Sequence, residues 1–533
     1  MIILGIHGGF TLHQHDAAAT LVINGKLISS IEEERVFRQK NSLGLLPINS
    51  IKKCLEEASI SMKDVDLIAL PGETYNDLEE RTKNWITHYW GCCPKILLVN
   101  HQIAHIASSF FHSNFDNAMC LTMDAFGDKL SAALVKADKE TGLTILETRP
   151  FSNSLGVFYA TMTNFLGFRS MDEFKVMGLA PYGRPTVDLS FFCKPTIDGY
   201  FSDPQYFRNI SNASHLEQYY STKLIDKLGE PRRIGAPLSS FYKDVAASTQ
   251  KTLEDCAISL VKYLHKITNE ENLCISGGVG LNCSMNKKLS ELDFVKKIFV
   301  QPASSDRGLS LGCALYASNL NNIKIEKINH VYYGPSYSDD FIKQQIKISN
   351  LKYQEIDNPH EIAANFLSEG KIIAWHNGRS EFGPRALGNR SILANPSIAD
   401  MKDQINAKIK FREEFRPFAP SICLEDYQEV FSTPVSLPYM TVACDVDEKW
   451  RLKLPATTHV NNTARVQTVD KKTNIKYHQL ISEFKKNTGI PAVLNTSFNI
   501  QGQPIVETPL EAISTFSSNG IDALFLENYL FVK

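Results

Sequence analysis

Short apolar runs separated by polar loops begin the chain, a pattern typical of strands that end in functional loops. Residues 2–6, "IILGI", predict a buried strand, and the polar loop after it contains His13 and His15. Residues 19–23 and 26–31, "ATLVI" and "KLISSI", flank an Asn-Gly pair, which is the strongest short-range signal of a β-hairpin. This stretch therefore predicts three strands with a polar loop after the first.

The same order of elements recurs about 110 residues later. "AMCLTM" predicts a strand, Asp124 lies in the loop after it, and "SAALVKA" and "LTILET" predict a second hairpin joined by "DKETG". Two such β-β-β units, each followed by helical segments, predict a two-lobed α/β domain. Because ligand sites in open α/β sheets lie at strand ends, we expect His15 and Asp124 to face one cleft.

The middle of the chain combines a long helical pattern with a strand that runs into a glycine turn. Residues 245–265 carry apolar residues at helical spacing, and "NLCISGGVGLNC" predicts a turn where backbone N–H groups can approach a nucleotide. Further on, the charged and irregular stretch "IKIEKINHVYYGPSYSDD" predicts a domain boundary near residue 332. We therefore expect one domain over 1–332 and a second α/β domain over 333–533.

Composition and charge exclude several classes of protein. The 533 residues are 43% hydrophobic and 21% charged, which is typical of a globular chain of two or three domains. The 56 Lys and Arg residues against 58 Asp and Glu residues give a formal charge of -2, so we expect neither polymeric nucleic acid nor an anionic membrane as a partner. Eleven cysteines without a C-x-x-C motif indicate a reducing, cytoplasmic location. We find no signal-peptide pattern and no apolar run of the ~18 residues that a membrane span requires.

His101 and His105 stand four residues apart at the head of the apolar segment "HQIAHIASSFFHSNF". On a helix both imidazoles lie on one face and can reach one ion. Asp124 and Asp306, the latter in the turn "PASSDRGLSLG", would complete a mixed nitrogen and oxygen set that suits Fe(II), Mn(II) or Zn(II). The pattern alone leaves two interpretations open, a metal site and a pair of satisfied or solvated histidines.

Basic residues are concentrated between positions 378 and 420, where eight of them accompany five acidic residues. Arg385 and Arg416 are flanked by Gly, Pro, Phe and Ala, so their guanidiniums require an anionic partner in partly apolar surroundings. A solvated charged face is the alternative, and on this argument we favour an anion site.

Asn495 and Ser497 follow an apolar strand, and Arg465 lies in the alternating pattern "NTARVQTV". Hydroxyl groups and backbone donors at a strand end can complete a phosphate cradle that arginines begin. A capped turn explains the same residues equally well.

Nine extended motifs follow one another along the chain: "HDAAATLVINGKLISSIEEER", "HQIAHIASS", "SLGVFYATMTNFLGF", "KVMGLAPYG", "SGGVGLNCSMN", "GRSEFGPRALGNRSILANP", "REEFRPFAPS", "THVNNTARVQTV" and "LNTSFNIQGQPIV". In this order they resemble the O-carbamoyltransferases of the nodulation-factor and cephamycin type, the NodU and CmcH family that includes the tobramycin enzyme. Nine ordered motifs are far more specific than any single one, so the chain is identified as a member of that family.

The resemblance implies a fold and a reaction. The N-terminal domain would resemble the actin/Hsp70-like fold of the universal tRNA threonylcarbamoyl transferase, and the C-terminal domain the YrdC type. Carbamoyl phosphate and ATP would give carbamoyl-AMP, whose carbamoyl group passes to a hydroxyl of a small-molecule acceptor. The cofactor would be a divalent metal, Fe(II) first, with Mn(II), Zn(II) and Mg(II) as alternatives. A homodimer is left open.

The resemblance also implies site residues, motif by motif. His15 of "HDAAA" would be the general base that takes the proton of the acceptor hydroxyl. The metal ligands would be His101, His105, Asp124 and Asp306. The ATP and carbamoyl-adenylate contacts would be Asp124, Gly156, Lys175, Gly277, Gly278 and Asn282. The carbamoyl-phosphate contacts would be Lys40, Arg385, Lys410, Arg416, Arg465, Asn495 and Ser497.

Two departures from the family pattern concern the substrates. Where relatives often show "NVRGEPIV", Gln501 and Gln503 replace a basic and an acidic residue, so a charge pair is lost. His13 stands where the tobramycin-type enzyme has an acidic residue facing a cationic sugar, so we do not expect an aminoglycoside acceptor. A sugar hydroxyl, a natural-product alcohol or a hydroxymethylated nucleotide are the candidates, and we expect residues 184–241 to face the acceptor.

Two other functions compete with this one. The chain would be an ATP- and metal-binding regulator if it kept the fold without turnover, but the presence of His15 and Ser497 argues against this. A tRNA-modifying carbamoyl transferase would need a basic stripe for its polyanionic substrate, and the balanced charge argues against one.

Overall fold

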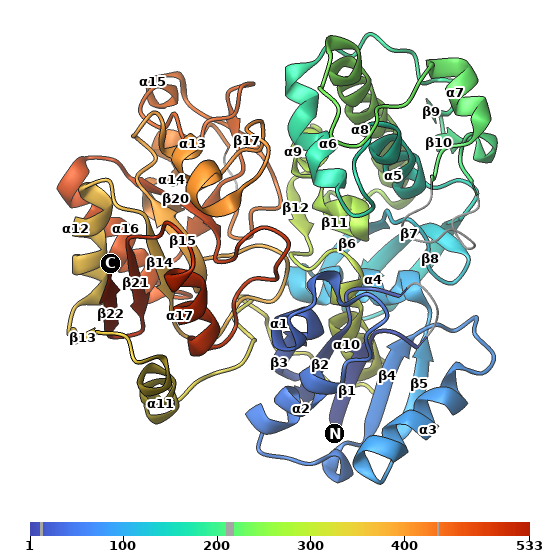
Figure 1. Cartoon of the computed structure of the whole chain (residues 1–533). Coiled ribbons are helices and arrows are strands. Elements are labelled where there is room, and N and C mark those ends of the chain that lie inside the picture. The colour runs from blue at the N-terminus through green and yellow to red at the C-terminus, as the bar shows by residue number, and fades with distance from the viewer. Residues whose placement is uncertain (11–13, 209–217, 434–435) are drawn as a thin grey trace. The chain divides into compact units, whose positions relative to one another are not determined.

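The computed structural model describes residues 1–10, 14–208, 218–433 and 436–533. His13 lies outside the described residues. Within them the chain is a mixed α/β protein with three large sheets, two of five strands and one of eight (Figure 1). The predicted α/β class is therefore confirmed.

The chain forms two compact units. The first unit comprises residues 1–71, 77–98 and 306–533, and the second comprises residues 72–76 and 99–305. The division into domains over 1–332 and 333–533 stays a prediction. None of the helices within the described residues has both the length and the apolar character needed to cross a membrane.

The N-terminal sheet contains β1 (Ile2–His7), β2 (Ala18–Ile23), β3 (Lys26–Glu32), β4 (Leu67–Pro71) and β5 (Lys95–Val99) in the order β3-β2-β1-β4-β5 (Figure 1). Asn24 and Gly25, with φ angles of 50° and 83°, close the predicted hairpin between β2 and β3. Such a tight turn requires positive φ at both central residues, which explains the Asn-Gly pair. Helix α10 (Leu309–Leu320) packs on β1, β2 and β4, and α2 (Ile48–Glu57) packs on β2 and β3.

The second unit contains a sheet of the same plan. Its strands are β6 (Asn117–Thr122), β7 (Leu130–Asp138), β8 (Gly142–Pro150), β11 (Asn272–Ser276) and β12 (Lys297–Val300), in the order β12-β11-β6-β7-β8. Strand β6 pairs antiparallel with β7 and parallel with β11, as β1 does with β2 and β4. The repeated strand order confirms the predicted duplication, and it is the arrangement that the resemblance to an actin/Hsp70-like fold implies.

Helices cover this second sheet. Helix α4 (His101–Ser113) packs on β6, β7 and β11, and the long helix α8 (Ser240–Thr268) contains the predicted helical segment 245–265. The other helices of the second unit are α5 (Leu155–Phe165), α6 (Glu173–Leu179), α7 (Thr222–Leu228) and α9 (Cys283–Ser290), and a small sheet pairs β9 (Cys193–Thr196) with β10 (Gly199–Ser202).

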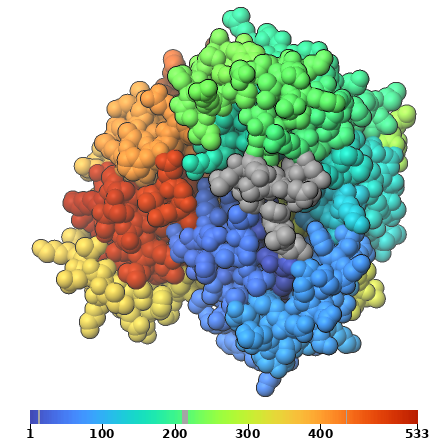
Figure 2. Space-filling model, turned by 45° about the vertical axis from the view of Figure 1, so that its right-hand side comes forward, coloured from blue at the N-terminus to red at the C-terminus, as the bar shows by residue number. Residues whose placement is uncertain are grey.

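The C-terminal sheet of the first unit has eight strands in the order β13-β22-β21-β14-β15-β20-β16-β19. They are β13 (Gln354–Glu355), β14 (Ile373–His376), β15 (Arg390–Ala394), β16 (Ala419–Cys423), β19 (Gln467–Val469), β20 (Ala492–Ser497), β21 (Ala523–Leu526) and β22 (Tyr529–Val532). Figure 2 shows the yellow segment near residue 350 beside the red C-terminal segments, in agreement with the pairing of β13 with β22.

Apolar side chains cover both faces of this sheet. Ala374 and Leu494 belong to one core cluster, whereas Ile373 and Val493, their chain neighbours, belong to another. Because successive strand residues point to opposite faces, a strand buried on both sides is apolar throughout. The α-helices in the described part of this region are α11 (Asp339–Ser349), α12 (Pro359–Ser368), α13 (Met401–Ile405), α14 (Tyr427–Val430), α15 (Glu448–Arg451), α16 (Ile475–Thr488) and α17 (Pro509–Ser517).

Candidate functional site

Helix α4 carries the two predicted metal-binding histidines one turn apart. The Asn100 side chain caps the helix by accepting hydrogen bonds from two backbone N–H groups of the first turn. Nε2 of His101 lies 3.2 Å from Oδ2 of Asp124, and Nε2 of His105 lies 3.6 Å from the same oxygen. All three side chains are buried, so the structure brings them together as the sequence predicts.

Two neighbours fix the position of His101. Its backbone N–H donates to Oδ2 of Asp128 at 2.7 Å, while Oδ1 of that carboxylate accepts from the N–H and the hydroxyl of Thr74 at 3.1 and 2.9 Å. A Cβ at Gly127 would lie 2.2 Å from the His101 ring, so only glycine leaves room for the imidazole there. Gly127 was not among the predicted site residues, although it belongs to the same strand-end loop as Asp124.

The donor set fits a divalent metal. Ligand atoms of His101, His105 and Asp124 lie within 4.8 Å of one another, and two imidazole nitrogens with a carboxylate suit Fe(II), Mn(II) or Zn(II). Asp306, the predicted fourth ligand, belongs to the first unit, where its Oδ2 lies 3.5 Å from Nε2 of His7. Its role as a ligand stays a prediction.

The predicted nucleotide-binding glycines surround the backbone at Asp124. The N–H of Gly278 donates to Oδ1 of Asp124 at 3.1 Å. A Cβ at Gly156 would lie 2.6 Å from the Asp124 carbonyl oxygen, and one at Gly277, whose φ is 87°, would lie 2.4 Å from the Met123 carbonyl oxygen. Close approach of backbone to backbone thus requires glycine here, a reason that differs from the predicted one of leaving room for the nucleotide.

Asn282 and Lys175 both have partners within the second unit. The Asn282 side chain caps α9 and exchanges two hydrogen bonds with the amide of Gln250, at 2.9 and 3.0 Å. Nζ of Lys175 lies 3.0 Å from Oδ2 of Asp172, and 5.6 Å from the centre of the Phe168 ring. Asn282 therefore positions the glycine turn, and nucleotide contact by either residue stays a prediction.

His15 lies in the loop between β1 and β2, beside a buried carboxylate. Its Nδ1 is 3.5 Å from Oδ2 of Asp16, a residue that adopts a positive φ of 57° and is only 3% exposed. Arg307 holds Asp16 with two guanidinium hydrogen bonds, at 2.6 and 3.3 Å. The His15 side chain is 28% exposed, so its ring is accessible although the neighbouring Asp16 is held in place.

Arg307 is the centre of a buried ion network that sequence reasoning missed. Its Nη1 lies 3.4 Å from Glu32 and 3.6 Å from Glu34, and Nε of Arg35 lies 2.9 Å from Glu32. Burial opposes the charge of Arg307, yet Asp16, Glu34 and Glu32 hold its pKa above the ordinary value. Burial conversely raises the pKa of Glu32. One feature of the sequence could have pointed to Arg307: it is a charged residue between Asp306 and Gly308 in a turn made mostly of small residues.

Lys410 is the centre of the predicted carbamoyl-phosphate set. It lies at the end of the π-helical segment η8 (Asn406–Lys410) and is 4% exposed. Its Nζ donates to the carbonyl oxygen and hydroxyl of Ser497 and to the carbonyl and Oδ1 of Asn499, the latter two at 3.0 and 2.8 Å. Burial, Arg412, Arg416 and Lys40 lower the pKa of Lys410 well below its usual range. A bound anion would favour the charged form of this group.

Burial and nearby positive charge also affect the neighbouring Arg412. Burial first, and then Arg416 and Arg465, lower the pKa of Arg412 to about 9. The Arg412 guanidinium stacks on the Phe418 ring at 4.3 Å, and Glu413 is 3.8 Å from Arg416. The structure therefore brings four predicted residues, Lys40, Lys410, Arg416 and Arg465, into one cation cluster and adds Arg412, which was not predicted as a contact.

Asn495 and Ser497 lie two residues apart on β20 and so share one face of the strand. Nδ2 of Asn495 donates to Oγ of Ser421 and Oε1 of Gln467, both at 3.0 Å, and to the Ala386 carbonyl at 3.2 Å. Its Oδ1 is buried and has no hydrogen-bond partner among the described residues. A buried acceptor without a partner can take a hydrogen bond from a ligand or from water.

Three other positions singled out in the sequence are partly or fully exposed in this region. Arg385, directly before Ala386, is half-buried in the loop between β14 and β15. Gln501 and Gln503 are exposed, and Gln503 contributes its backbone carbonyl to Nδ2 of Asn499 at 2.7 Å. Whether the loss of the charge pair at these glutamines alters phosphate binding stays a prediction.

Comparison with known proteins identifies the family of the chain. A family model described as carbamoyltransferase N-terminus matches residues 3–90 and 81–315, and one described as carbamoyltransferase C-terminus matches residues 364–533. The chain belongs to the carbamoyltransferase family and is a transferase.

Several named relatives support the assignment. Nodulation protein NolNO of Sinorhizobium fredii is 36% identical over 100% of this chain and 83% of its own. Nodulation protein NolO of Bradyrhizobium diazoefficiens is 38% identical over 82% and 79% of the two chains, and nodulation protein U of Rhizobium fredii is 37% identical over 92% and 89%.

Solved structures give looser likenesses. Component A of the Acidaminococcus fermentans (R)-2-hydroxyglutaryl-CoA dehydratase is 17% identical over 60% of this chain and 99% of its own, with a TM-score of 0.35. HypF of T. kodakarensis is 15% identical over 60% and 48% of the two chains, with a TM-score of 0.33.

Proposed function

We propose that the chain is an ATP-dependent O-carbamoyltransferase that modifies a hydroxyl group of a small molecule. In the first stage, water displaces phosphate from carbamoyl phosphate, an oxygen of the resulting carbamate attacks the α-phosphorus of ATP, and pyrophosphate leaves. In the second stage, the acceptor oxygen attacks the carbamoyl carbon of carbamoyl-AMP, the bond to AMP breaks, and the hydroxyl proton passes to His15. The products are a carbamate ester, AMP, pyrophosphate and phosphate.

The cation cluster supports the first stage. Lys410, Arg416 and Arg465 would bind the phosphate of carbamoyl phosphate, with Lys40 and Arg385 approaching from neighbouring loops. Fixed ammonium and guanidinium donors bind a dianionic phosphate strongly, and they stabilise the additional charge as phosphate departs. The lowered pKa values of Lys410 and Arg412 support this role, because a bound anion would offset the burial and the repulsion between neighbouring cations that lower them.

The observation on which the proposal rests most is the unsatisfied Oδ1 of Asn495, on the same strand face as Ser497, which accepts hydrogen bonds from Lys410. The carbamoyl group differs from other small acyl groups by its NH2, which donates hydrogen bonds. Oδ1 of Asn495 would accept one of them, while Ser497, on the same face of β20, would contact the phosphate. A site built to hydrogen-bond an N–H group rejects analogues that lack it.

The second unit would hold the nucleotide in this mechanism. Asp124 with His101 and His105 would hold the divalent metal, which when bound withdraws electrons from the adenylate phosphate and improves AMP as a leaving group. The N–H of Gly278, already directed at Asp124, would orient that carboxylate. Gly156, Gly277 and Asn282 would keep the backbone in place around it, and Lys175 would approach the phosphates.

His15 would act in the transfer stage. A neutral imidazole can accept the hydroxyl proton as the new carbon–oxygen bond forms, which typically accelerates a reaction by about a hundred- to ten-thousand-fold. Asp16, at 3.5 Å from Nδ1, would keep the proton of the neutral ring on that nitrogen and leave Nε2 to receive the new one.

We place the reaction in the cytoplasm, with a sugar, natural-product or hydroxymethylated-nucleotide hydroxyl as the acceptor. All eleven cysteines lie in the described residues and are free thiols, which supports a reducing compartment.

The first stage can be tested without knowing the acceptor. The chain with ATP, a divalent metal and carbamoyl phosphate should release pyrophosphate, and Arg416→Ala should lower this release by roughly a hundredfold or more. Lys408→Ala, an exposed position on the same stretch, serves as the matched control and should leave it unchanged.

A substrate comparison tests the assignment of Asn495. The unmodified chain should discriminate strongly between carbamoyl phosphate and acetyl phosphate, and Asn495→Leu should remove most of this preference. Pyrophosphate release without carbamoyl phosphate, or an unchanged preference in Asn495→Leu, would contradict the proposal.

A further inference from the structure

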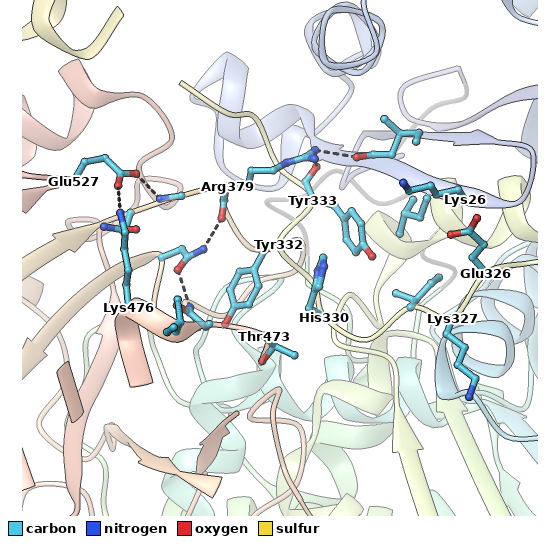
Figure 3. A pocket seen from close by; sticks show the side chains of 18 residues that line it. Lys26, Glu326, Lys327, His330, Tyr332, Tyr333, Arg379, Thr473, Lys476 and Glu527 are labelled. Carbon is cyan, nitrogen blue, oxygen red and sulfur yellow. Dashed lines mark hydrogen bonds and ion pairs between the residues drawn. The ribbon is translucent and has the colours of Figure 1, made fainter. Parts of the chain in front are cut away.

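A pocket in the first unit shares no residue with the site described above. It has a volume of about 710 Å³. Its walls come from the start of β3, the segment 326–333, the turn after β14 and the beginning of α16 (Figure 3). A pocket of this size accommodates a small organic molecule.

Cations outnumber carboxylates around this pocket. Its positively charged side chains are Lys26, Lys327, Arg379 and Lys476, and its negatively charged ones are Glu326 and Glu527. The pocket therefore has an excess of two positive charges. Lys476 is paired with Glu527 at 2.8 Å, so the excess is concentrated elsewhere on the wall. In a chain whose overall charge is -2, this excess favours an anionic occupant.

Arg379 makes its hydrogen bonds to the backbone. Its Nε donates to the Gly334 carbonyl at 2.7 Å, and Nη2 donates to the carbonyls of Ile28 and Tyr333 at 3.0 and 2.9 Å. The carboxylate that pairs with it, Glu57, is 3.8 Å away and does not line the pocket. Carbonyl contacts fix the guanidinium in place and leave its positive charge available to a ligand.

Two polar groups of the wall lack a protein partner. Asn377 is 6% exposed, and its Nδ2 donates to no group in the described part of the chain; Nδ1 of His330 is buried and equally unpaired there. Burial and Arg379 lower the pKa of His330, so its ring is neutral at pH 7 and has both a donor and an acceptor nitrogen. A ligand with matching donors and acceptors would satisfy both groups.

Aromatic rings line the same wall. The His330 and Tyr333 rings are stacked, with centroids 4.6 Å apart, and Tyr332 lies 5.9 Å from His330. Figure 3 shows these three rings side by side, below Arg379. Such a wall favours a ligand with a flat body in addition to its charge.

Hydrogen bonds connect this wall to Asn495. The Tyr332 hydroxyl donates to the Leu387 carbonyl at 2.9 Å, and Nε2 of Gln467 donates to the same oxygen at 2.7 Å. Oε1 of Gln467 in turn accepts from Nδ2 of Asn495 at 3.0 Å. A displacement of Tyr332 would therefore reach the residue that we assign to carbamoyl recognition.

We propose that this pocket is an effector site for a small organic oxyanion, a phosphate or carboxylate with a flat body, and that its occupancy alters the KM for carbamoyl phosphate. The anionic end meets Lys26, Arg379 and the amide of Asn377, and the body lies along the rings of His330 and Tyr333. The effect on KM rests on the proposed function; the binding itself does not.

Binding is measured by calorimetry on the full chain carrying Arg416→Ala, which removes phosphate binding at the carbamoyl-phosphate residues. The probes are phenyl phosphate and benzoate, which distinguish the two kinds of oxyanion, and neutral benzyl alcohol. One equivalent of at least one oxyanion should bind and benzyl alcohol should not. Adding Lys26→Glu should weaken the affinity at least about tenfold, whereas Lys347→Glu, the same charge change on α11, should not.

Asn377→Asp gives an independent reading, since a carboxylate there repels the oxyanion and should also weaken binding. Absence of oxyanion binding, or equal affinity in the Lys26→Glu and Lys347→Glu chains, overturns the site. In the chain without Arg416→Ala, the bound probe should shift the KM for carbamoyl phosphate by roughly fivefold or more. An unchanged KM with intact turnover overturns the effector role alone, whereas absent turnover counts against the proposed function.

Discussion

At the scale of single residues, the clearest energetic feature is Arg307 among buried carboxylates. Asp16, Glu32 and Glu34 are each less than one-tenth exposed and all lie near its guanidinium. Removal of one member of such a network leaves the others buried without a counter-charge, which costs far more than the loss of an exposed ion pair.

Arg307→Met should therefore lower the free energy of unfolding by roughly 3–5 kcal/mol. The comparison is Lys251→Met, which breaks the exposed pair of Lys251 with Asp255 and should cost less than about 1 kcal/mol. Urea denaturation followed by circular dichroism measures both. Equal losses in the two variants would show that the network does not stabilise the loop that carries His15.

His15→Asn should separate the two proposed stages. Pyrophosphate release that depends on carbamoyl phosphate should persist, while carbamoylation of an acceptor should fall by about two to four orders of magnitude, because no base takes the hydroxyl proton. Mass spectrometry of the acceptor and a pyrophosphate assay measure the stages side by side. A parallel loss of both activities would contradict the assignment of His15 to transfer.

Residue types within motifs could be predicted from the sequence, but their partners could not. His101 and His105 were recognisable because their spacing is local, and the structure places them together with Asp124. Arg307 and Asp16 are 291 positions apart, and no local pattern links them. The importance of Gly127 could not be predicted for a similar reason, because the ring that excludes a side chain there belongs to another element.

At the scale of elements, loops that join neighbouring strands position much of the chemistry. Asp124, Gly127 and Asp128 all belong to the connection between β6 and β7, which contacts the first turn of α4. The hairpins of both sheets were predictable because an Asn-Gly turn and strand alternation are local signals. The strand order was predictable only through the repeat, because pairing between distant strands leaves no periodic trace in the sequence.

Gly127→Ala tests how the loop supports α4. The new methyl group would overlap the His101 ring, so the ring must rotate and metal affinity should fall by about ten- to a hundredfold, as for loss of a supporting group around a ligand. Elemental analysis after equilibrium dialysis against Fe(II) or Zn(II) measures this, with His105→Ala as the reference for loss of a ligand. Unchanged metal content in a folded Gly127→Ala chain would show that His101 is not a ligand.

At the scale of the whole molecule, the predicted chemistry is divided between two units. The cation cluster belongs to the first unit and the histidine pair to the second. Family membership could be predicted from the sequence because nine motifs span nearly the entire chain. The composition of the first unit could not, because it joins the N-terminal sheet to the last 228 residues through contacts between distant segments.

The crowding of positive charge around Lys410 links substrate uptake to the acidity of the medium. In the free protein this ammonium group is a stronger acid than an ordinary lysine, and a bound dianion would make it a weaker one again, so the complex should take up a proton. The affinity for carbamoyl phosphate should then decline as the pH rises above the lowered pKa of Lys410 in the free protein. Calorimetry in phosphate-free buffers of different ionisation enthalpy measures this proton uptake. The heats of binding should differ between buffers for the parent chain. They should coincide for Lys410→Met, measured at high ligand concentration because its affinity is lower.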